Sequence, residues 1–221
     1  MRHRVLNLTF HGIGDVNKQM EPGEQRVWMD FSRFQSVLDC VAGQPAIRLT
    51  FDDGNASDVA LALPELLGRN LRATFFLLAG KIDKPGYVGR AGVRELVRRG
   101  MGVGTHGMDH RDWRRLDDQT LQAEVVDSVR ILGEIAGQPV TQASCPFGSY
   151  DRRVLRFLRR AGLEQVYTSD RGWAWEGEWL QTRNTIDQHG EPCVSDLLQD
   201  GSASGVSSWP RRLWHVCKRW R

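Results

Sequence analysis

Two stretches of the sequence carry residue types that could hold a metal ion. The first is Asp52-Asp53, which follows the apolar run of residues 46–51 and precedes Gly54. Adjacent carboxylates at the end of a buried strand repel each other, so a positive charge is expected beside them. The second is the pair His106 and His110, whose spacing places both side chains on one face of a helical turn. Two imidazoles and one carboxylate with open coordination positions suit a catalytic zinc or a similar divalent ion.

The two aspartates can take different roles at such a site. One can bind the metal, and the other can accept a proton from a water molecule whose pKa the ion lowers from about 15.7 to about 7. The resulting hydroxide can attack a carbonyl, and the metal stabilises the developing oxyanion. Each pair also has an ordinary explanation, because histidines at this spacing occur by chance and aspartates can cap a helix. Their occurrence at two strand ends of one repeating pattern favours the metal site.

Strands and helices alternate along the chain. Apolar runs predict strands at residues 5–10, 46–51, 73–78, 101–104, 140–144 and 165–168, and helices begin near Asp30, Asp58, Asp117 or Asp118, and Asp151, with another around 93–97. This alternation predicts a parallel sheet with helices outside it, either doubly wound or closed into a barrel. Polar residues follow the strands at His11, Asp52-Asp53, His106, 146–148 and Asp170. Since the loops after barrel strands gather at one end, we expect a single site there.

The sequence Thr50-Phe51-Asp52-Asp53-Gly54, followed by His106-x-x-x-His110, resembles the first two motifs of the polysaccharide deacetylases, the NodB-homology or carbohydrate esterase 4 family. The resemblance covers about residues 5–186. It implies an α/β fold, a distorted (β/α) barrel with about seven parallel strands. It also implies that Asp52 is the general base and that Asp53, His106 and His110 hold the metal, usually zinc. The implied reaction removes acetyl groups from N-acetylated sugars of a poly- or oligosaccharide or of a lipid-linked precursor.

The third motif departs from the family pattern. Where the family commonly has Arg-Pro-Pro-Tyr/Phe-Gly, this chain has Ser-Cys-Pro-Phe-Gly at residues 144–148, which resembles a branch reading Tyr-Pro-Phe-Gly that is linked to exopolysaccharide synthesis. In the family, an aspartate of the fourth motif steadies the missing arginine and tunes the base. We expect Asp170 at that position, in a catalytic role, with Arg171 or Arg183 as a replacement for the arginine.

The general acid is open at this point, because the fifth family motif, Leu-x-His, is not found. His189 is one candidate, and an exposed loop position is its alternative. His11 is another, because Thr9-Phe10-His11 resembles a Tyr-His near the start of the same branch; it either lines the pocket as a catalytic residue or only fixes the first loop. Trp173, Trp175 and Trp179 form either a sugar-stacking platform or the core face of a strand.

Composition sets the remaining bounds. The 221 residues, 40% hydrophobic and 26% charged, are typical of one soluble globular domain. No run of about 20 apolar residues and no signal peptide core is found, so we expect a cytoplasmic protein. Four widely spaced cysteines are expected to be free thiols. Other functions on the same scaffold are an O-deacetylase, a hydrolase of another C–N bond, or a catalytically weak glycan-binding protein.

The basic residues are concentrated at the C-terminus. From Trp209 onward there are five lysines and arginines and no acids, so the net charge of +3 leaves the rest of the chain at −2. A body without a broad basic face argues against nucleic acid as a partner. We divide the chain into a catalytic domain at 1–205 and a Trp-rich basic tail at 206–221. On a helix, the tail would place tryptophans opposite arginines, which suits peripheral contact with an anionic membrane or docking on the barrel.

Overall fold

The computed structural model describes residues 3–202, so the predicted tail at 206–221 lies outside the described residues. The strands are β1 (Arg4–Phe10), β2 (Ile47–Phe51), β3 (Ala73–Leu77), β4 (Gly102–Thr105), β5 (Gln142–Ser144), β6 (Gln165–Tyr167), β7 (Ala174–Trp175), β8 (Leu180–Gln181) and β9 (Arg183–Thr185). The helices are α1 (Phe31–Val41), α2 (Leu63–Gly68), α3 (Arg90–Arg98), α4 (Asp118–Gln122), α5 (Ser128–Ala136), α6 (Arg152–Arg160) and α7 (Val194–Ser202). Two π-helical segments extend them: η2 (Asp58–Ala62) leads into α2, and η5 (Ala123–Asp127) joins α4 to α5.

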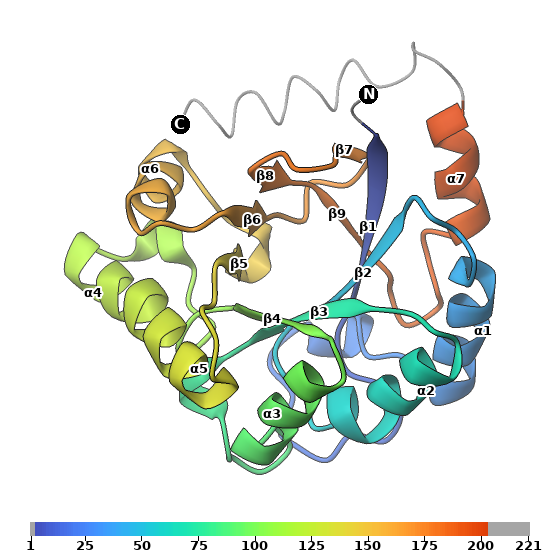
Figure 1. Cartoon of the computed structure of the whole chain (residues 1–221), viewed down its shortest axis with the longest axis horizontal. Coiled ribbons are helices and arrows are strands. Elements are labelled where there is room, and N and C mark those ends of the chain that lie inside the picture. The colour runs from blue at the N-terminus through green and yellow to red at the C-terminus, as the bar shows by residue number, and fades with distance from the viewer. Residues whose placement is uncertain (1–2, 203–221) are drawn as a thin grey trace.

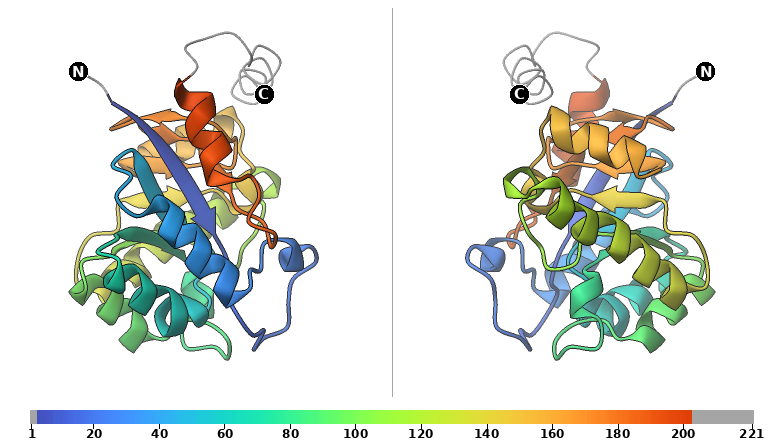
Figure 2. Two further views of the ribbon diagram at one scale, coloured as in Figure 1. Left: turned by 90° about the vertical axis from the view of Figure 1, so that its right-hand side faces the viewer. Right: turned by 90° about the vertical axis from the view of Figure 1, so that its left-hand side faces the viewer.

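The strands form a nearly closed barrel. Strands β1 to β6 lie side by side in chain order, each parallel to the next. Residues 180–185 then complete the ring, because β8 pairs with β6 and β9 pairs with β1, again in parallel. Among the strands of residues 3–202, only β7 runs antiparallel, against the start of β1. Helices surround the strands, and α7 lies beside α1 (Figures 1 and 2). This arrangement confirms the predicted barrel.

Aromatic and aliphatic side chains fill the space between the strands and the helices. Phe51 stacks on Phe75 with ring centroids 4.6 Å apart, and Phe10 lies 5.3 Å from both Phe34 and Phe51. All four rings are buried. Burying such rings is among the largest sources of folding free energy in a core. The apolar runs of the sequence therefore form the strands because both of their faces are covered.

Several helix starts follow the predicted caps. Asp117 accepts a hydrogen bond from the Thr120 amide at 2.7 Å, and Asp151 accepts one from the Val154 amide at 2.8 Å. Each satisfies an amide that the first helical turn leaves without a partner. Asp58 differs, since it is fully buried at the start of π-helical segment η2 rather than exposed at a helix end.

Two further observations bear on the sequence analysis. Within residues 3–202, no helix combines the length and the apolar character needed to cross a membrane. In the same part of the chain, Cys40, Cys145 and Cys193 are free thiols, as predicted. Cys145 is fully buried against apolar neighbours.

Candidate active site

A cavity of about 220 Å³ lies where the strands end. Its lining combines residues that follow β1, β2, β4 and β6 with the loop before α1 and the turn after β5. They are His11, Glu21, Pro22, Gly23, Glu24, Arg26, Val27, Asp52, Asp53, His106, His110, Phe147, Gly148 and Ser169. The predicted rim residues His11, Asp52, Asp53, His106 and His110 are thus brought together. Parallel strands deliver them to one end because their carboxyl termini all point the same way.

Three of these side chains form a compact group. The Oδ1 atom of Asp53 lies 3.5 Å from Nε2 of His106 and 3.7 Å from Nε2 of His110. All three atoms lie within 4.8 Å of one another. The Asp53 Oδ1 atom is buried and has no hydrogen-bond partner among the described residues. A buried carboxylate oxygen without a partner is costly, and a cation between it and two imidazole nitrogens would remove that cost. The group fits a divalent metal ion with three protein ligands and an open position.

The outer nitrogen of each imidazole is also engaged. Nδ1 of His106 donates to the backbone oxygen of Ser144 at 2.9 Å, which leaves Nε2 with a lone pair toward Asp53. Nδ1 of His110 lies 2.7 Å from the carboxylate of Glu21. Such outer partners fix ring orientation and raise ligand basicity. Burial lowers the pKa of His106 to about 4, despite the nearby carboxylates, so its imidazole is neutral at neutral pH.

The histidines converge through a bent loop, which corrects the predicted helical turn. Gly107 has φ 96° and His110 has φ 57°, both in the left-handed region. Buried Glu124 holds the loop by accepting hydrogen bonds from the amides of Met108 at 3.1 Å and Asp109 at 3.4 Å. A Cβ at Gly107 would come within 2.6 Å of the Glu124 carboxylate, so this position requires glycine.

Asp52 points beside this group and is held by Arg183. Nη1 and Nη2 of Arg183 each donate to a different Asp52 oxygen at 2.7 Å, and Nη2 also donates to Oγ of Ser144 at 2.6 Å. The guanidinium is fully buried. Burial alone would raise the pKa of Asp52, but the charge and hydrogen bonds of Arg183 outweigh it and hold the pKa well below its usual range. Asp52 is therefore a carboxylate that can accept a proton.

Arg183 supplies the arginine that the third motif lacks. Position 144 carries a small serine, and the Arg183 side chain reaches Ser144 and Asp52 from β9 on another side of the barrel. Strand β9 pairs with β1, which pairs with β2, so the arginine enters the interior close to the end of β2. Of the two candidates from the sequence, Arg183 occupies this place, while Arg171 is exposed.

Asp170 lies one step behind this pair. Its carboxylate accepts hydrogen bonds from the hydroxyls of Thr168, at 3.1 Å, and Tyr150. The backbone oxygen of Thr168 in turn accepts a hydrogen bond from Nε of Arg183 at 3.2 Å. Asp170 is buried, and it reaches Arg183 through Thr168. Asp170 does not line the cavity, so this geometry lets it position Arg183, and its predicted catalytic role stays a prediction.

The two candidate acids differ in location. His11 is half-buried, lines the cavity, and has an Nδ1 atom without a hydrogen-bond partner in the described structure. His189 is exposed and pairs with the neighbouring Gln188 side chain at 3.0 Å. It is not among the residues that line the cavity. The exposed-loop interpretation of His189 therefore holds.

The three tryptophans do not form a platform at the cavity. Trp173 and Trp179 are half-buried and use their indole N–H groups to bind the backbone oxygens of Leu197 and Leu163. Trp175 lies on β7 and is 43% exposed. None of the three lines the cavity. The aromatic ring at the cavity is instead Phe147, which is 61% exposed with its centroid 4.3 Å from that of His110.

Sequence reasoning missed two residues that shape the site, Glu21 and Glu124, and it identified Ser144 only as a departure from the family motif. Glu21 lies in the loop before α1, where no periodic pattern predicts a position. A buried ion pair anchors this loop, with Nζ of Lys18 2.6 Å from Glu24. Ser144 stands where the family has an arginine. A small polar residue there leaves room for a side chain from another strand, and this was the available sequence signal for Arg183.

Comparisons with known proteins agree with this geometry. The family model of polysaccharide deacetylases matches residues 41–166. A putative polysaccharide deacetylase, YxkH of Bacillus subtilis, is 23% identical over 76% of this chain and 65% of its own length. The peptidoglycan-N-acetylglucosamine deacetylase PgdA of Listeria monocytogenes is 31% identical over 63% of this chain but only 29% of its own length. A chitooligosaccharide deacetylase of Azorhizobium caulinodans is 26% identical over 72% of this chain and 75% of its own length.

Solved structures show the same fold. A polysaccharide deacetylase from Bacillus cereus superposes with a TM-score of 0.75 at 19% identity, covering 90% of this chain and 69% of its own. IcaB from Ammonifex degensii gives 0.71 at 21% identity, covering 88% of this chain and 97% of its own. The chain spans about two thirds of YxkH and under a third of PgdA. Because the family model matches more than half of the sequence, this chain belongs to the polysaccharide deacetylase family.

Proposed function

We propose that this chain is a zinc-dependent deacetylase that hydrolyses the acetamido group of an N-acetylated sugar in a poly- or oligosaccharide or its lipid-linked precursor. The observation that carries the proposal is the pairing of buried Asp52 with Arg183 beside the group of Asp53, His106 and His110. One carboxylate is kept ionised and the other has an unpartnered oxygen. This division of roles is what hydrolysis with a general base and a metal requires.

Asp53, His106 and His110 would hold the divalent ion. Bound there, the ion supplies Lewis-acid polarisation of the acetyl carbonyl and acidifies a water molecule. Asp52 takes the proton of the attacking water, and Arg183 keeps Asp52 in the charged form until that transfer. Asp170 helps to position the Arg183 guanidinium, because Thr168 binds both of them through hydrogen bonds. The two histidines are held by Ser144 and Glu21, and buried Glu124 holds the loop between them, so their imidazoles need little reorganisation.

Breaking the C–N bond requires a proton on the departing nitrogen. His11 lies in the same cavity as Asp52 and has a ring nitrogen without a partner in the described structure. We assign it the role of general acid: water adds to the carbonyl carbon, acetate leaves, and the sugar nitrogen receives a proton from His11 as the amine forms. The exposed ring of Phe147 at the cavity edge offers a flat apolar surface, which suits the apolar face of a pyranose.

The Asp52–Arg183 pair argues against the alternative function, that of a glycan-binding protein with weak catalysis. Such a protein could lose the arginine without consequence, yet here a residue from a different strand replaces it and makes both hydrogen bonds to the base. Burying a guanidinium is costly unless it is fully paired. Retaining it at 0% exposure beside the predicted base supports an active hydrolase.

The test is an acetate-release assay on purified full-length chain, with metal content measured on the same preparation. The panel holds chitooligosaccharides, peptidoglycan fragments, an N-acetylated exopolysaccharide and an O-acetylated xylan. We expect zinc-dependent acetate release from at least one N-acetylated substrate, abolished by Asp52→Asn. Release from the O-acetylated polymer alone would make the protein an O-deacetylase. No release from any member by metal-replete protein would contradict the proposal.

A further inference from the structure

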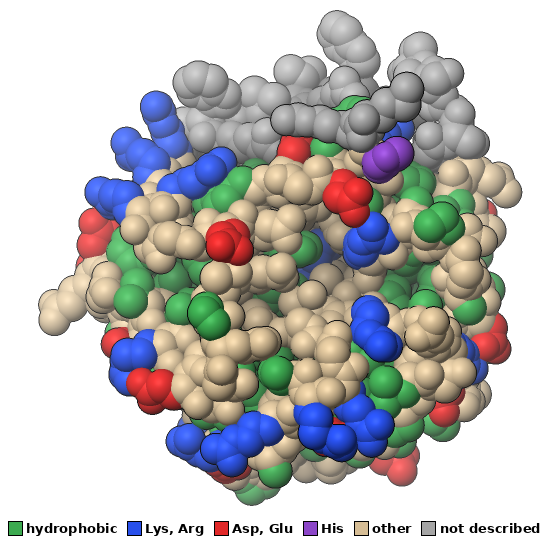
Figure 3. All heavy atoms as spheres, in the orientation of Figure 1, with side chains coloured by type: hydrophobic (Ala, Val, Ile, Leu, Met, Phe, Trp, Pro, Cys, Tyr) green, Lys and Arg blue, Asp and Glu red, His purple; other side chains and the backbone are tan. Residues whose placement is uncertain are grey.

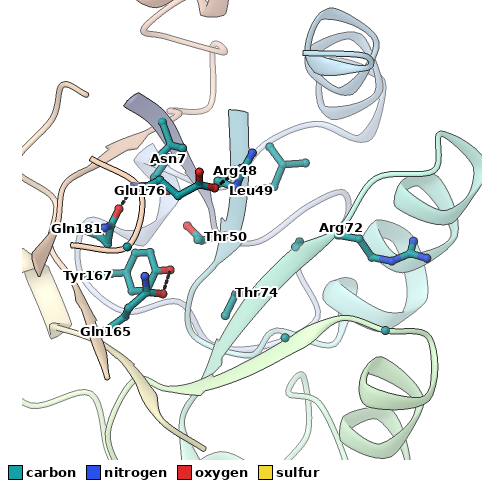
Figure 4. Close-up of a pocket in the computed structure, with 15 residues that line it drawn as sticks. Asn7, Arg48, Leu49, Thr50, Arg72, Thr74, Gln165, Tyr167, Glu176 and Gln181 are labelled. Carbon is teal, nitrogen blue, oxygen red and sulfur yellow. Dashed lines mark hydrogen bonds and ion pairs between the residues drawn. The ribbon is translucent and has the colours of Figure 1, made fainter. Parts of the chain in front are cut away.

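A second cavity, of about 350 Å³, lies at the opposite end of the barrel (Figure 4). Residues of β1, β2, β3, β4 and β6 and the turn between β7 and β8 line it. Arg72 and Gly100 precede their strands, and Ala73, Gly102 and Gln165 are the first residues of theirs, whereas Thr50, Tyr167 and Gln181 lie deeper in the barrel. The catalytic cavity lies beyond the strand ends. The two cavities have no lining residue in common.

The charged groups of this cavity compensate one another or point away from it. Nη2 of Arg48 lies 2.7 Å from the Glu176 carboxylate, and these side chains are 46% and 50% exposed, so they form the rim. Arg72 also belongs to the lining, but its guanidinium points away from the other labelled residues in Figure 4. In the space-filling view, which keeps the orientation of Figure 1, the face is hollowed near its middle (Figure 3). The interior of the cavity is therefore polar but carries no unpaired charge.

Neutral hydrogen-bonding groups line the deeper part. Asn7 and Gln181 are only 2% exposed, and Nδ2 of Asn7 donates to Oε1 of Gln181 at 3.1 Å. Gln181 in turn donates to the backbone oxygens of Trp175 and Glu178, which fixes its amide. These contacts hold the side chains in place before any ligand binds, which lowers the entropy cost of binding.

Two further lining side chains, Gln165 and Thr74, have hydrogen-bonding groups without a partner among the described residues. The Tyr167 hydroxyl donates to Oε1 of Gln165 at 3.0 Å, which orients the glutamine. In the described part of the chain, neither the Gln165 amide nitrogen nor the Thr74 hydroxyl has a hydrogen-bond partner. Both side chains are half-buried and lie among the labelled lining residues in Figure 4. A donor amide and a hydroxyl beside small apolar residues form a surface that binds neighbouring hydroxyl groups.

We propose that this cavity is a second binding site, for a neutral saccharide unit. A saccharide presents several hydroxyls that exchange hydrogen bonds with amides and hydroxyls, which is the chemistry of Asn7, Thr74, Gln165 and Gln181. An anion would need a cation directed into the cavity, but Arg48 is already paired with a carboxylate and the Arg72 guanidinium points away. A charged ligand of either sign would lose its hydration without compensation. The inference rests on this lining and not on the deacetylase activity.

The site would also communicate with the catalytic base through one residue. Thr50 lines the second cavity, and its hydroxyl lies 3.3 Å from Nη1 of Arg183, the atom that also donates to Asp52. The Tyr167 ring, another part of the lining, lies 5.9 Å from the same guanidinium. The layer between the two cavities is thus one side chain thick at this point.

The test is a titration of full-length protein carrying His106→Ala, which weakens the catalytic site, with glucose, N-acetylglucosamine and cellobiose followed by amide NMR shifts. We expect saturable shifts for at least one sugar, centred on residues 72–74 and 165–167. Gln165→Leu and Thr74→Val should each weaken binding at least about tenfold, whereas Gln138→Leu, the same change at an exposed position, should not. Melting temperature checks that each variant is folded, and Thr74→Val keeps the volume of the side chain if Gln165→Leu is unstable.

Three outcomes would overturn the proposal. One is the absence of saturable binding by all three sugars. Another is binding that folded Gln165→Leu and Thr74→Val variants leave unchanged, which would place the sugar elsewhere. The third is saturable binding of inorganic sulfate at these residues in preference to the sugars, which would show that the cavity selects an anion. Each result is independent of acetate release, so failure here leaves the proposed deacetylase untouched, and the converse also holds.

Discussion

The two ends of the barrel are built from the same strands but differ in whether charged side chains are buried there. At the carboxyl end, Asp52, Asp53, His106 and His110 are concentrated within one cavity, and a buried arginine compensates only Asp52. At the amino end, the cavity has a neutral interior and its one ion pair lies on the exposed rim. A buried carboxylate oxygen without a partner is costly, and a cation between Asp53, His106 and His110 would remove that cost. The carboxyl end therefore offers a group of side chains that fits a cation.

Backbone conformation follows the same division. Asp53, His110 and Phe147 have φ of 75°, 57° and 58°, and all three line the catalytic cavity. No residue other than glycine that lines the opposite cavity has a positive φ. Each left-handed residue of this kind costs about 1–3 kcal/mol and persists only where the surroundings hold it. Of the six non-glycine residues with positive φ among the described residues, three therefore line the catalytic cavity and none lines the opposite one.

The largest expected effect follows from removing a metal ligand. His106→Ala should abolish both metal binding and activity, because two remaining ligands do not hold a divalent ion tightly. Metal content by plasma mass spectrometry and acetate release on the same sample provide the measurement. His189→Ala, a change at an exposed histidine, is the matched control and should keep both. Full metal occupancy in folded His106→Ala protein would remove this residue from the ligand set.

Asp52→Asn tests the division of roles between the adjacent aspartates. The asparagine keeps the shape of the side chain but cannot accept the proton, so we expect turnover to fall by about 10²–10⁴-fold. Metal should stay bound, because Asp52 lies beside the ligand group and not within it. Steady-state kinetics with metal analysis check this. Loss of metal together with turnover would instead make Asp52 a ligand.

His11→Gln tests the assignment of the general acid. We expect turnover to fall by about 10²-fold or more, the lower end of general acid catalysis, with the melting temperature nearly unchanged. The effect should shrink for an acetate ester with a good leaving group, which needs no proton on departure. A large drop in melting temperature with normal specific activity would show that His11 only fixes the first loop.

Arg183→Met tests whether the arginine keeps the base ionised. Arg183 depresses the pKa of Asp52, so removing it should raise that pKa and move the acid limb of the pH–rate profile upward by about one unit or more. The protein should also lose about 3–5 kcal/mol of stability near pH 7, because a buried carboxylate loses its partner. A depressed pKa stabilises the fold above the unfolded value of about 3.9, so the loss should shrink as the pH falls below about 4.

Arg171→Met is the matched control for that variant, because Arg171 is the other arginine that the sequence offered for this role and its side chain is exposed. Its pH–rate profile and its melting curve should match those of the unmodified protein. If Arg183→Met leaves the acid limb of the pH–rate profile at the same pH, then groups other than Arg183 keep Asp52 ionised.

The smallest effect is expected from Glu21→Gln. The glutamine still accepts a hydrogen bond from His110 but carries no charge, so we expect metal affinity to fall by about 10–100-fold with little change in turnover at saturating metal. Competition with a fluorescent chelator measures the affinity. Glu134→Gln, at an exposed position, is the control. Unchanged affinity would mean that Glu21 lies near His110 without tuning it.

The sequence by itself determined a parallel sheet with helices outside it and the core of the site, and its resemblance to a known family implied that the sheet closes into a barrel. Alternating elements with polar residues after the strands predict the parallel strands, and the positions of Asp52, Asp53, His106 and His110 predict the cavity because strand direction fixes where those residues must meet. Local signals sufficed, since hydrophobic periodicity and helix caps depend on near neighbours in the chain. The caps at Asp117 and Asp151 are examples.

Only the tertiary structure decided which residues complete the site. Arg183 lies 131 positions from Asp52, and the sequence could not choose between it and Arg171. Glu21 lies 89 positions from His110, and no pattern in the sequence connects the two. The predicted helical turn at His106 was wrong for a related reason: the loop takes its shape from Glu124, which the helical segment after α4 delivers. Such pairings are chosen by burial, because a charge that leaves water must find its partner wherever the closed barrel places one.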